Sequence, residues 1–322
     1  MKQAAVACCK LYVSESRNGK ALEAIEKAAR AYPHAAALLN AFEDKDYNRV
    51  GYTLVFPFSS SQQQQSSCPS QNTVLRMVRA ALQAINLEGH SGTHPRLGVV
   101  DHICYHPLGD ASLHQVASLA RSLAADIGLT LKVPTFLYGA AHHENRNLDS
   151  IRRALGYFKP NHEGQWVGLA SGPLSLSPDY GPSQVLSSTG VVIVGACPFV
   201  VNYNVPVVSN DLVRGRRIAK KLSARGGGLP DVQAMALIHG VKGMEIACNL
   251  LDAKNVGPDK VQEEVASLAE KEGLIVEHGY LTDYSEDQIL AAALQRLKLM
   301  EKDNLANGLV EPRANIIMES LD

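Results

Sequence analysis

The sequence predicts an α+β protein made of two sandwich subdomains of ferredoxin-like type, in which helices pack on mixed sheets. Helix-like and strand-like segments alternate along the chain, and the order β-α-β-β-α-β can be read twice, first from residue 4 and again from about residue 191. Of the 322 residues, 46% are apolar and 20% are charged, which is typical of soluble globular proteins. Two such sandwiches would leave a crevice between their sheets, and ligands commonly bind in crevices of this kind.

The first predicted subdomain covers residues 1–197. Capping residues and apolar stripes indicate its helices, with Asn18 as an N-cap and Gly128 after the end of a later helix. In order, we expect a strand at 4–13, a helix at 18–32, strands at 35–42 and 50–56, a helix at 72–87, a strand at 97–106, a helix at 111–127, a strand at 131–138 and a short helix at 148–157. The glutamine-rich stretch at 59–70 has little to bury, so we expect a mobile surface loop there.

The second predicted subdomain covers residues 198–305 and is followed by a tail at 306–322. After a strand pair around 191–208, we expect a helix at 209–225, strands at 233–239 and 243–251, a helix at 258–272 and a strand at 274–281. Ser285 and Gln288 form a capping-box pattern, which indicates the start of a final helix.

Charge, cysteine content and hydropathy argue against several classes of protein. The chain has 31 lysines and arginines against 32 aspartates and glutamates, and this balance argues against binding nucleic acid by bulk electrostatics. Its six cysteines form no CxxC pair, which fits a reducing compartment. The longest apolar run, at 191–201, is shorter than the roughly 20 residues that span a bilayer, and no secretory signal is visible. We therefore expect a cytoplasmic protein without nucleic-acid or membrane partners.

The densest group of reactive residue types lies at 88–101, between a predicted helix and a predicted strand. Glycines and Pro95 prevent a regular helix there, so we expect His90 and His94 on an exposed turn. His94 could move a proton in either direction near neutral pH, and the planar fork of Arg96 suits a carboxylate. Alternatively, the two histidines only cap the turn through hydrogen bonds, or they ligate a metal ion, which would need a third ligand.

Other segments keep a functional and a structural interpretation open. His102 and His106 share one face of a predicted strand. His142 and His143 follow the end of another strand, where the structural interpretation is a polar loop. The stretch at 179–190 is either a linker or, because of its small hydroxyl residues and open backbone, a binding segment for a flat heterocycle. One helix is either a solvated face or a surface for a polyanionic ligand tail, and it carries Arg214, Arg216, Arg217, Lys220, Lys221 and Arg225.

Two motifs resemble the formiminotransferase domain of formiminotransferase-cyclodeaminases. His94-Pro95-Arg96-Leu97-Gly98, followed by Asp101, resembles the HPRMG…D loop of that family, and Asp179-Tyr180-Gly181-Pro182-Ser183 resembles its DFGPS folate-binding segment. Supporting matches in the family's order are Ser14-Glu15, Arg17-Asn18, Asn48-Arg49, Tyr52-Thr53, Leu137-Tyr138-Gly139 and Asn249-Leu250-Leu251-Asp252. The similarity covers most of the chain and is greatest to the stand-alone formiminotransferase-like proteins of plants, so we expect no cyclodeaminase domain.

The resemblance implies that tetrahydrofolate binds between two α/β subdomains as cosubstrate. It also implies transfer of a formimino group from N-formiminoglutamate to N5 of tetrahydrofolate, with His94 as general acid and base and with release of glutamate. The folate-binding residues that it implies are Gly181, Pro182, Ser183, Gln184, Val185, Leu186, Ser187, Ser188, Thr189 and Gly190. The candidates for substrate binding are Arg96, Asn48, Arg49 and Tyr138; no metal is expected, and the family implies a homodimer.

The sequence departs from the family pattern where substrate contacts are expected. Tyr12 and Phe42 lie in stretches that lose the family's asparagine, aspartate and small residues, Ala140 replaces a glutamate, and Thr189 replaces a tryptophan. Loss of polar contacts around a retained histidine suggests a changed or lost donor. One alternative is therefore a folate-binding protein of the same fold without transferase turnover, and another is a different nucleophile that acts on a small amide or amidine with the same histidine.

Overall fold

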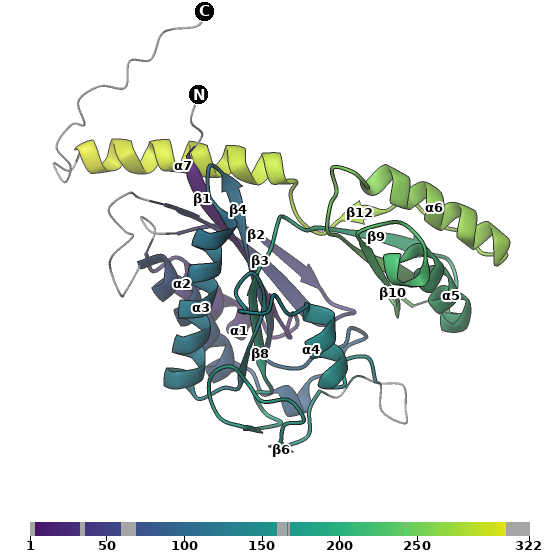
Figure 1. The fold of residues 1–322 in the computed structure, drawn as a ribbon, viewed down its shortest axis with the longest axis horizontal. Helices are drawn as coiled ribbons and strands as arrows, with labels where there is room; N and C mark the ends of the chain where they lie inside the picture. The colour runs from purple at the N-terminus through teal and green to yellow at the C-terminus, as the bar shows by residue number, and fades with distance from the viewer. Residues whose placement is uncertain are drawn as a thin grey trace, which may run out of the picture.

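The computed structural model describes residues 4–32, 36–58, 69–159, 166, 168–241 and 243–306. Within these residues the chain forms two multi-stranded sheets, each covered by helices (Figure 1), so the predicted α+β class is confirmed. Residues 59–68 of the loop that we expected at 59–70 lie outside the described residues. So do residues 307–322 of the expected tail.

The larger sheet has six strands in the order β2-β3-β1-β4-β8-β5. These strands are β1 (Ala5–Val13), β2 (Ala37–Asp44), β3 (Arg49–Pro57), β4 (Val100–Gly109), β5 (Thr135–Gly139) and β8 (Val192–Ala196). The first four pair antiparallel, whereas β8 runs parallel to both β4 and β5. The sheet is therefore mixed, as the sequence predicted.

Three helices cover one face of the larger sheet, namely α1 (Gly19–Ala29), α2 (Pro69–Ala84) and α3 (Leu113–Asp126). Because side chains alternate along a strand, Cys9 and Leu11 of β1 point into the core beneath these helices. Lys10 and Tyr12 consequently lie on the opposite face, where the Tyr12 ring stacks on His102 of β4 with 5.6 Å between centroids. The opposite face thus carries polar and aromatic groups.

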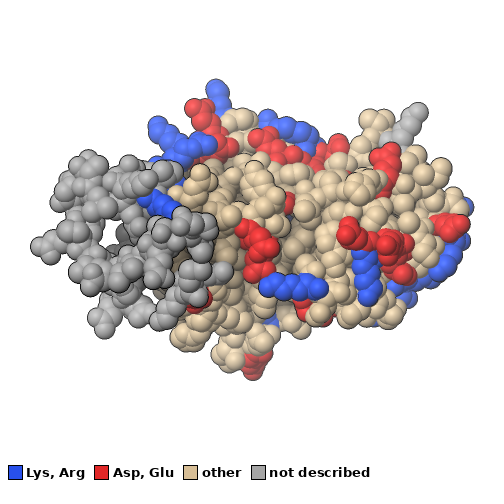
Figure 2. Space-filling view, turned by 90° about the horizontal axis from the view of Figure 1, so that it is seen from above, with Lys and Arg blue, Asp and Glu red and all other residues tan. Residues whose placement is uncertain are grey.

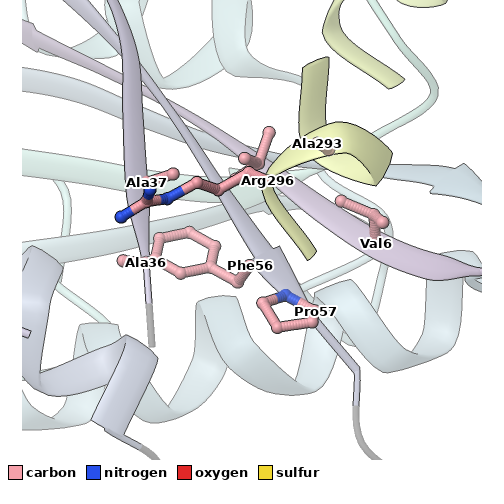
Figure 3. A pocket seen from close by; sticks show the side chains of 8 residues that line it. Val6, Ala36, Ala37, Phe56, Pro57, Ala293 and Arg296 are labelled. Atoms are coloured by element: carbon pink, nitrogen blue, oxygen red, sulfur yellow. The ribbon is translucent and has the colours of Figure 1, made fainter. Parts of the chain in front are cut away.

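Helices from later in the chain cover parts of that opposite face. They are α4 (Leu148–Ala154) and α7 (Glu286–Ala306), and α7 lies across the top of the sheet in Figure 1. Ala293 of α7 packs in one cluster with Val6 of β1. The cavity between them, lined also by Arg296, measures about 10 Å³ and leaves no room for a ligand (Figure 3).

The smaller sheet has four antiparallel strands in the order β10-β11-β9-β12, so the expectation of a mixed sheet does not hold for it. Its elements are β9 (Val201–Val207), α5 (Leu212–Leu222), β10 (Val232–Ile238), β11 (Met244–Leu250), α6 (Pro258–Lys271) and β12 (Tyr280–Leu281). The sequence assigns residues 198–305 to this second unit, yet α7 packs on the larger sheet. In the described part of the chain, no helix is long and apolar enough to cross a bilayer.

The last predicted strand is much shorter than its hydropathy pattern suggests. We expected it at 274–281, but only Tyr280–Leu281 form a ladder with β9. The backbone just before them bonds to the side chain of Gln262 on α6: the N–H of Gly279 donates to its Oε1 at 2.8 Å, and its Nε2 donates to the carbonyl of Glu277 at 3.1 Å. Val276 still forms an isolated bridge with Val207, so these side-chain bonds interrupt the pairing with β9 between residue 276 and Tyr280.

Candidate functional site

A buried carboxylate holds the His94 loop in place. Asp101, at the start of β4, is fully buried, and its Oδ1 accepts a hydrogen bond from the backbone N–H of Leu97 at 2.7 Å. Its Oδ2 lies 2.9 Å from Nη1 of Arg49 and 3.7 Å from Nη2 of Arg152. Burial alone would raise the pKa of Asp101, but the two guanidinium groups bring it below its usual value. The loop is therefore anchored to a charge that two arginines keep ionised.

His94 is held in one tautomer. Its Nδ1 lies 2.7 Å from the carbonyl oxygen of Pro95, and because a carbonyl oxygen only accepts, Nδ1 carries the proton. Burial and the nearby charge of Arg49 lower the pKa of His94 to about 3, so the ring is neutral at ordinary pH. Its Nε2, which makes no hydrogen bond to any described residue, keeps a free lone pair.

Aromatic side chains from other elements surround His94. The ring of Tyr47, in the turn between β2 and β3, meets it edge-on with 5.2 Å between centroids, and the ring of Tyr157, which follows α4, lies 6.3 Å away. Arg152 of α4 in turn stacks over Tyr157 at 4.4 Å. Our reading of the sequence missed Tyr47, Tyr157 and Arg152, because each reaches the site only through the tertiary fold.

The structure brings the 181–190 segment beside the His94 loop. The N–H of Val99 donates to the carbonyl of Thr189, and the N–H of Val191 donates to the carbonyl of Leu97, each at 2.9 Å. Gly190 makes this pairing close, because a Cβ atom at that position would lie 2.1 Å from the Leu97 carbonyl oxygen. Two segments that are about 90 residues apart in the sequence therefore form one wall of the site.

The rest of the 181–190 segment is mostly open to solvent. Gly181, Ser183, Gln184 and Leu186 are exposed, whereas Val185 is buried. Pro182, Ser187, Ser188 and Thr189 are partly exposed, and Ser187 is bonded to Ser171 at 2.8 Å. Gln184 and Val185 form strand β7, which pairs with β6 (Gly172–Pro173) in a small ribbon that the sequence did not predict.

Arg96 is buried with unused donors. Only 3% of it is exposed, and its Nη2 donates to the carbonyl oxygen of His90 at 2.7 Å. Its Nε and Nη1, however, make no hydrogen bond within the part of the chain that the structure describes. Burial lowers the pKa of Arg96 to about 10, which still leaves it charged at neutral pH. A buried guanidinium with spare donors is suited to an anionic group.

The other three candidates for substrate binding already have partners. The amide of Asn48 accepts from the backbone N–H of Ser16 at 2.8 Å and donates to the carbonyl of Ser91 at 3.0 Å. Arg49 is paired with Asp101, as described above. The hydroxyl of Tyr138 lies 2.7 Å from Nε2 of His102. These residues lie around the same loop and sheet face, but their polar groups are engaged within the protein.

The remaining candidates are exposed or are paired with acidic groups. His142 is buried near Asp179 at 3.6 Å, while His143 is exposed. On the basic helix α5, Arg217 pairs with Glu272 at 2.6 Å. Figure 2 shows basic and acidic side chains interspersed on the face that it presents. The ion pair of Arg217 favours the solvated-face interpretation of α5.

Two groups of residues in the described ranges have the right composition to hold a metal ion. The first is Asp44, Asp46 and His239, and the second is Cys104, His106 and Cys197. In the first group, His239 bonds to Asp44 at 2.9 Å as part of the contact between the two sheets. Neither group includes His94.

Two departures from the family pattern contact the smaller sheet. The Tyr12 hydroxyl donates to Oδ1 of Asn202 at 3.0 Å, and the Phe42 ring packs on Tyr280 with 6.4 Å between centroids. A pocket of about 310 Å³ opens beside Phe42, lined by Asn40, Phe42, Leu281, Thr282, Asp283, Tyr284 and Gln288. Ala140 lies after β5, where its carbonyl accepts a 3.3 Å bond from Arg121.

Comparisons with known proteins agree with the motifs. A sequence model of the formiminotransferase domain, N-terminal subdomain, matches residues 6–197. The formiminotransferase cyclodeaminase-like protein of Arabidopsis thaliana is 57% identical over 285 residues, which are 88% of this chain and 94% of that protein. The glutamate formimidoyltransferase of Thermoplasma acidophilum is 28% identical over 310 residues, 89% of this chain and 97% of that protein. The formimidoyltransferase-cyclodeaminase of Mus musculus is 27% identical over 274 residues, which are 82% of this chain and 47% of that protein. The chain belongs to the formiminotransferase family.

Proposed function

We propose that this protein is a folate-dependent one-carbon transferase that moves a formimino or formyl group between glutamate and N5 of tetrahydrofolate. The observation that carries the proposal is the state of His94, which is neutral, fixed through Nδ1 on the Pro95 carbonyl and free at Nε2. The wall formed by residues 186–190 lies beside its loop. Family membership supports the choice of substrates, because one relative is named glutamate formimidoyltransferase.

His94 would act as a proton carrier in this reaction. Its Nε2 accepts the proton that N5 loses as N5 attacks the formimino carbon, and returns it to the glutamate nitrogen as the bond between that nitrogen and the carbon breaks. With a pKa of about 3, the protonated ring is a strong acid, so it holds the proton only briefly. The proton taken from N5 thus leaves with the glutamate nitrogen, and no other proton donor is needed for the transfer.

Arg96 would bind a carboxylate of the glutamate donor. Its Nε and Nη1 are the donors left over after the bond to His90, and they are buried close to the His94 loop. A guanidinium that presents two N–H groups recognises a carboxylate in a bidentate way. We assign the exposed backbone and hydroxyl groups of residues 183–189 to the flat pterin ring.

We further propose that both sheets are ferredoxin-like units and that the ligand lies between them. The strand order β2-β3-β1-β4 within the larger sheet has the same pattern as β10-β11-β9-β12 in the smaller one. Tyr47 supports a position near this boundary, since its ring contacts His94 and its hydroxyl bonds to Glu245 of β11 at 2.8 Å.

The test is an assay with N-formiminoglutamate and tetrahydrofolate that follows formation of the 5-formimino product. We expect turnover in the wild type and a loss of about 10²–10⁴-fold in His94→Ala, which is the usual contribution of a general acid–base group. His143→Ala is the matched control, because His143 is 78% exposed and lies outside the loop. Equal activity of the two variants would contradict the role of His94.

One observation favours the alternative of folate binding without turnover. Tyr12 and Phe42, which replace the family's residues, contact Asn202 and Tyr280 of the smaller sheet. These contacts take up space where the donor would lie if it bound between the sheets. Saturable tetrahydrofolate binding, followed by fluorescence of Trp166, without turnover of formiminoglutamate or formylglutamate would establish this second function.

A further inference from the structure

Two cysteines meet on the polar face of the larger sheet. Cys104 lies on β4, and Cys197 directly follows β8, the parallel neighbour of β4. Their sulfur atoms are 3.3 Å apart. A disulfide bond is about 2.05 Å long, so the two atoms need to approach by only about 1.3 Å to form one.

The two thiols differ in access and in acidity. Cys104 is 3% exposed, whereas Cys197 is partly exposed. A hydrogen bond from Cys104 lowers the pKa of Cys197, while burial raises the pKa of Cys104. Because the thiolate is the nucleophilic form, Cys197 is the sulfur that reacts first with a dissolved oxidant. Cys104 is then placed to react with the oxidised Cys197.

The imidazole of His106 argues against a metal ion as the occupant of this group. Its Nδ1 lies 3.8 Å from each sulfur, but also 3.1 Å from the carbonyl oxygen of Cys197 and 2.9 Å from that of Pro198. Both carbonyl oxygens only accept, so Nδ1 carries a proton and has no lone pair for a metal. The geometry therefore favours sulfur–sulfur chemistry.

Another cysteine lies close by but is less reactive. Cys8 of β1 is paired in register with His106 of β4. It is fully buried, and this burial raises its pKa to about 12. Cys8 is therefore less accessible to a dissolved oxidant than the partly exposed Cys197.

We propose that Cys104 and Cys197 are a reversible redox site that closes to a disulfide on contact with a hydroperoxide. The Cys197 sulfur attacks one peroxide oxygen, so that an S–O bond forms, the O–O bond breaks and, for hydrogen peroxide, a water molecule leaves. The Cys104 sulfur then attacks the Cys197 sulfur: the S–S bond forms, the S–O bond breaks, and the hydroxide leaves as water with the Cys104 proton. Two thiols and one hydrogen peroxide give one disulfide and two waters.

The test maps disulfides in the full chain after reduction, removal of the reductant and treatment with hydrogen peroxide. Free thiols are alkylated, and peptides are identified without reduction. We expect one crosslink between Cys104 and Cys197 that dithiothreitol reverses, that disappears in Cys104→Ser and Cys197→Ser, and that persists in the control Cys248→Ser. Cys248 is a matched control because it is buried in the smaller sheet.

Several outcomes would overturn this proposal. They are a crosslink of Cys197 to Cys8, oxidation of Cys197 to a sulfinic acid without any crosslink, and stoichiometric zinc in the purified protein that is lost in Cys104→Ser. Circular dichroism checks that the serine variants fold, and the map of the wild-type protein decides the question even if they do not. None of these measurements depends on folate or on transferase activity, so the redox site and the proposed function can fail separately.

Discussion

The hydroxyl of Tyr47 donates a hydrogen bond to the carboxylate of Glu245 at 2.8 Å. Tyr47 lies in the turn after β2 of the larger sheet and Glu245 lies on β11 of the smaller one, so this buried bond crosses from one sheet to the other. The ring of the same tyrosine packs edge-on against His94. The candidate base is thus coupled to the packing of the two sheets through one side chain.

Removal of the Tyr47 hydroxyl separates the bond to Glu245 from the packing of the ring against His94. In Tyr47→Phe, the buried carboxylate of Glu245 loses one donor and keeps Asn204, at 2.9 Å, and Tyr280. We therefore expect a loss of about 1–3 kcal/mol in the free energy of unfolding, measured with urea. The ring at position 47 stays beside His94, so we expect kcat to be unchanged in Tyr47→Phe. Tyr47→Ala also removes the ring, so we expect it to lower both the stability and kcat. Tyr284→Phe is the control, because Tyr284 is 49% exposed. If the control loses as much stability, the cross-sheet bond is not the cause.

His239 makes the same boundary sensitive to pH. Its Nε2 lies 2.9 Å from Asp44 and its Nδ1 3.3 Å from Glu245, and the hydrogen bond to Asp44 raises its pKa in spite of burial. A raised pKa in the folded state adds stability that is fully present below the unfolded value of about 6.5 and is lost as the pH rises through the folded value. We therefore expect the difference in unfolding free energy between wild type and His239→Gln to be largest below the unfolded pKa of about 6.5 and to shrink as the pH rises above it.

Urea unfolding at a series of pH values measures this difference. His143→Gln serves as the control, since the His143 side chain is 78% exposed and its nearest carboxylate, Glu144, is 3.8 Å away. A difference for His239→Gln that stays constant across the series would mean that the imidazole does not gain a proton at the sheet boundary.

Elements with local signals were predictable from the sequence. Asn18 caps α1 by accepting from the N–H of Ala21, as its position suggested, and Gly257 and Pro258 open α6 where a helix start was expected. What the sequence could not show is pairing at a distance. The strand β8 inserts between β4 and β5 although it follows both in the chain, and α7 returns to the larger sheet.

In the candidate site, too, residues in contiguous motifs were predictable from the sequence, whereas residues brought in by tertiary packing were not. The His94 loop and the segment at 181–190 are each contiguous, so their residues could be singled out before their contact was known. Tyr47 and Tyr157 carry no local pattern that points to His94, because their positions depend on how β2 and α4 pack. Asn48 was singled out through its motif, but its amide is engaged by Ser16 and Ser91.

The contact between the two loops can be broken at Gly190. In Gly190→Ala, the new Cβ would lie 2.1 Å from the Leu97 carbonyl oxygen, so the backbone must shift. Gly156→Ala is the matched control, because both glycines have a positive φ (+66° and +80°) but nothing lies within 4 Å of a Cβ at Gly156. We expect Gly190→Ala to lose about 1–3 kcal/mol more than the control from the clash and to bind tetrahydrofolate more weakly. Thermal melts and fluorescence titration measure the two effects, and equal behaviour of the variants would contradict the close pairing.

The anchoring role of Asp101 predicts a large effect from a small change. Asp101→Asn keeps the shape but leaves the buried charge of Arg49 without its 2.9 Å partner, so we expect a loss of about 3–5 kcal/mol in stability and a fall in kcat as the His94 loop loosens. In the control Asp149→Asn, an exposed helical pair with Arg153 is removed, which should change stability by less than about 1 kcal/mol. Similar losses in the two variants, measured by urea unfolding, would show that burial of Asp101 does not matter.

Arg96 should matter more for the donor than for the fold. Arg96 is 3% exposed and, among the described residues, its side chain makes one hydrogen bond, to His90. A buried charge is therefore only partly compensated in the free protein. Arg96→Met keeps the volume and removes the charge, and we therefore expect stability to be unchanged or higher. The KM for N-formiminoglutamate should rise by about 10-fold or more, since a charge-assisted hydrogen bond contributes about 1.5–3 kcal/mol, while tetrahydrofolate affinity stays constant. Arg153→Met on the surface of α4 should change none of these values. If Arg96→Met unfolds more easily but keeps the wild-type KM, Arg96 is a structural residue. Its guanidinium would then find its hydrogen-bond partners within the fold and not in the carboxylate of a substrate.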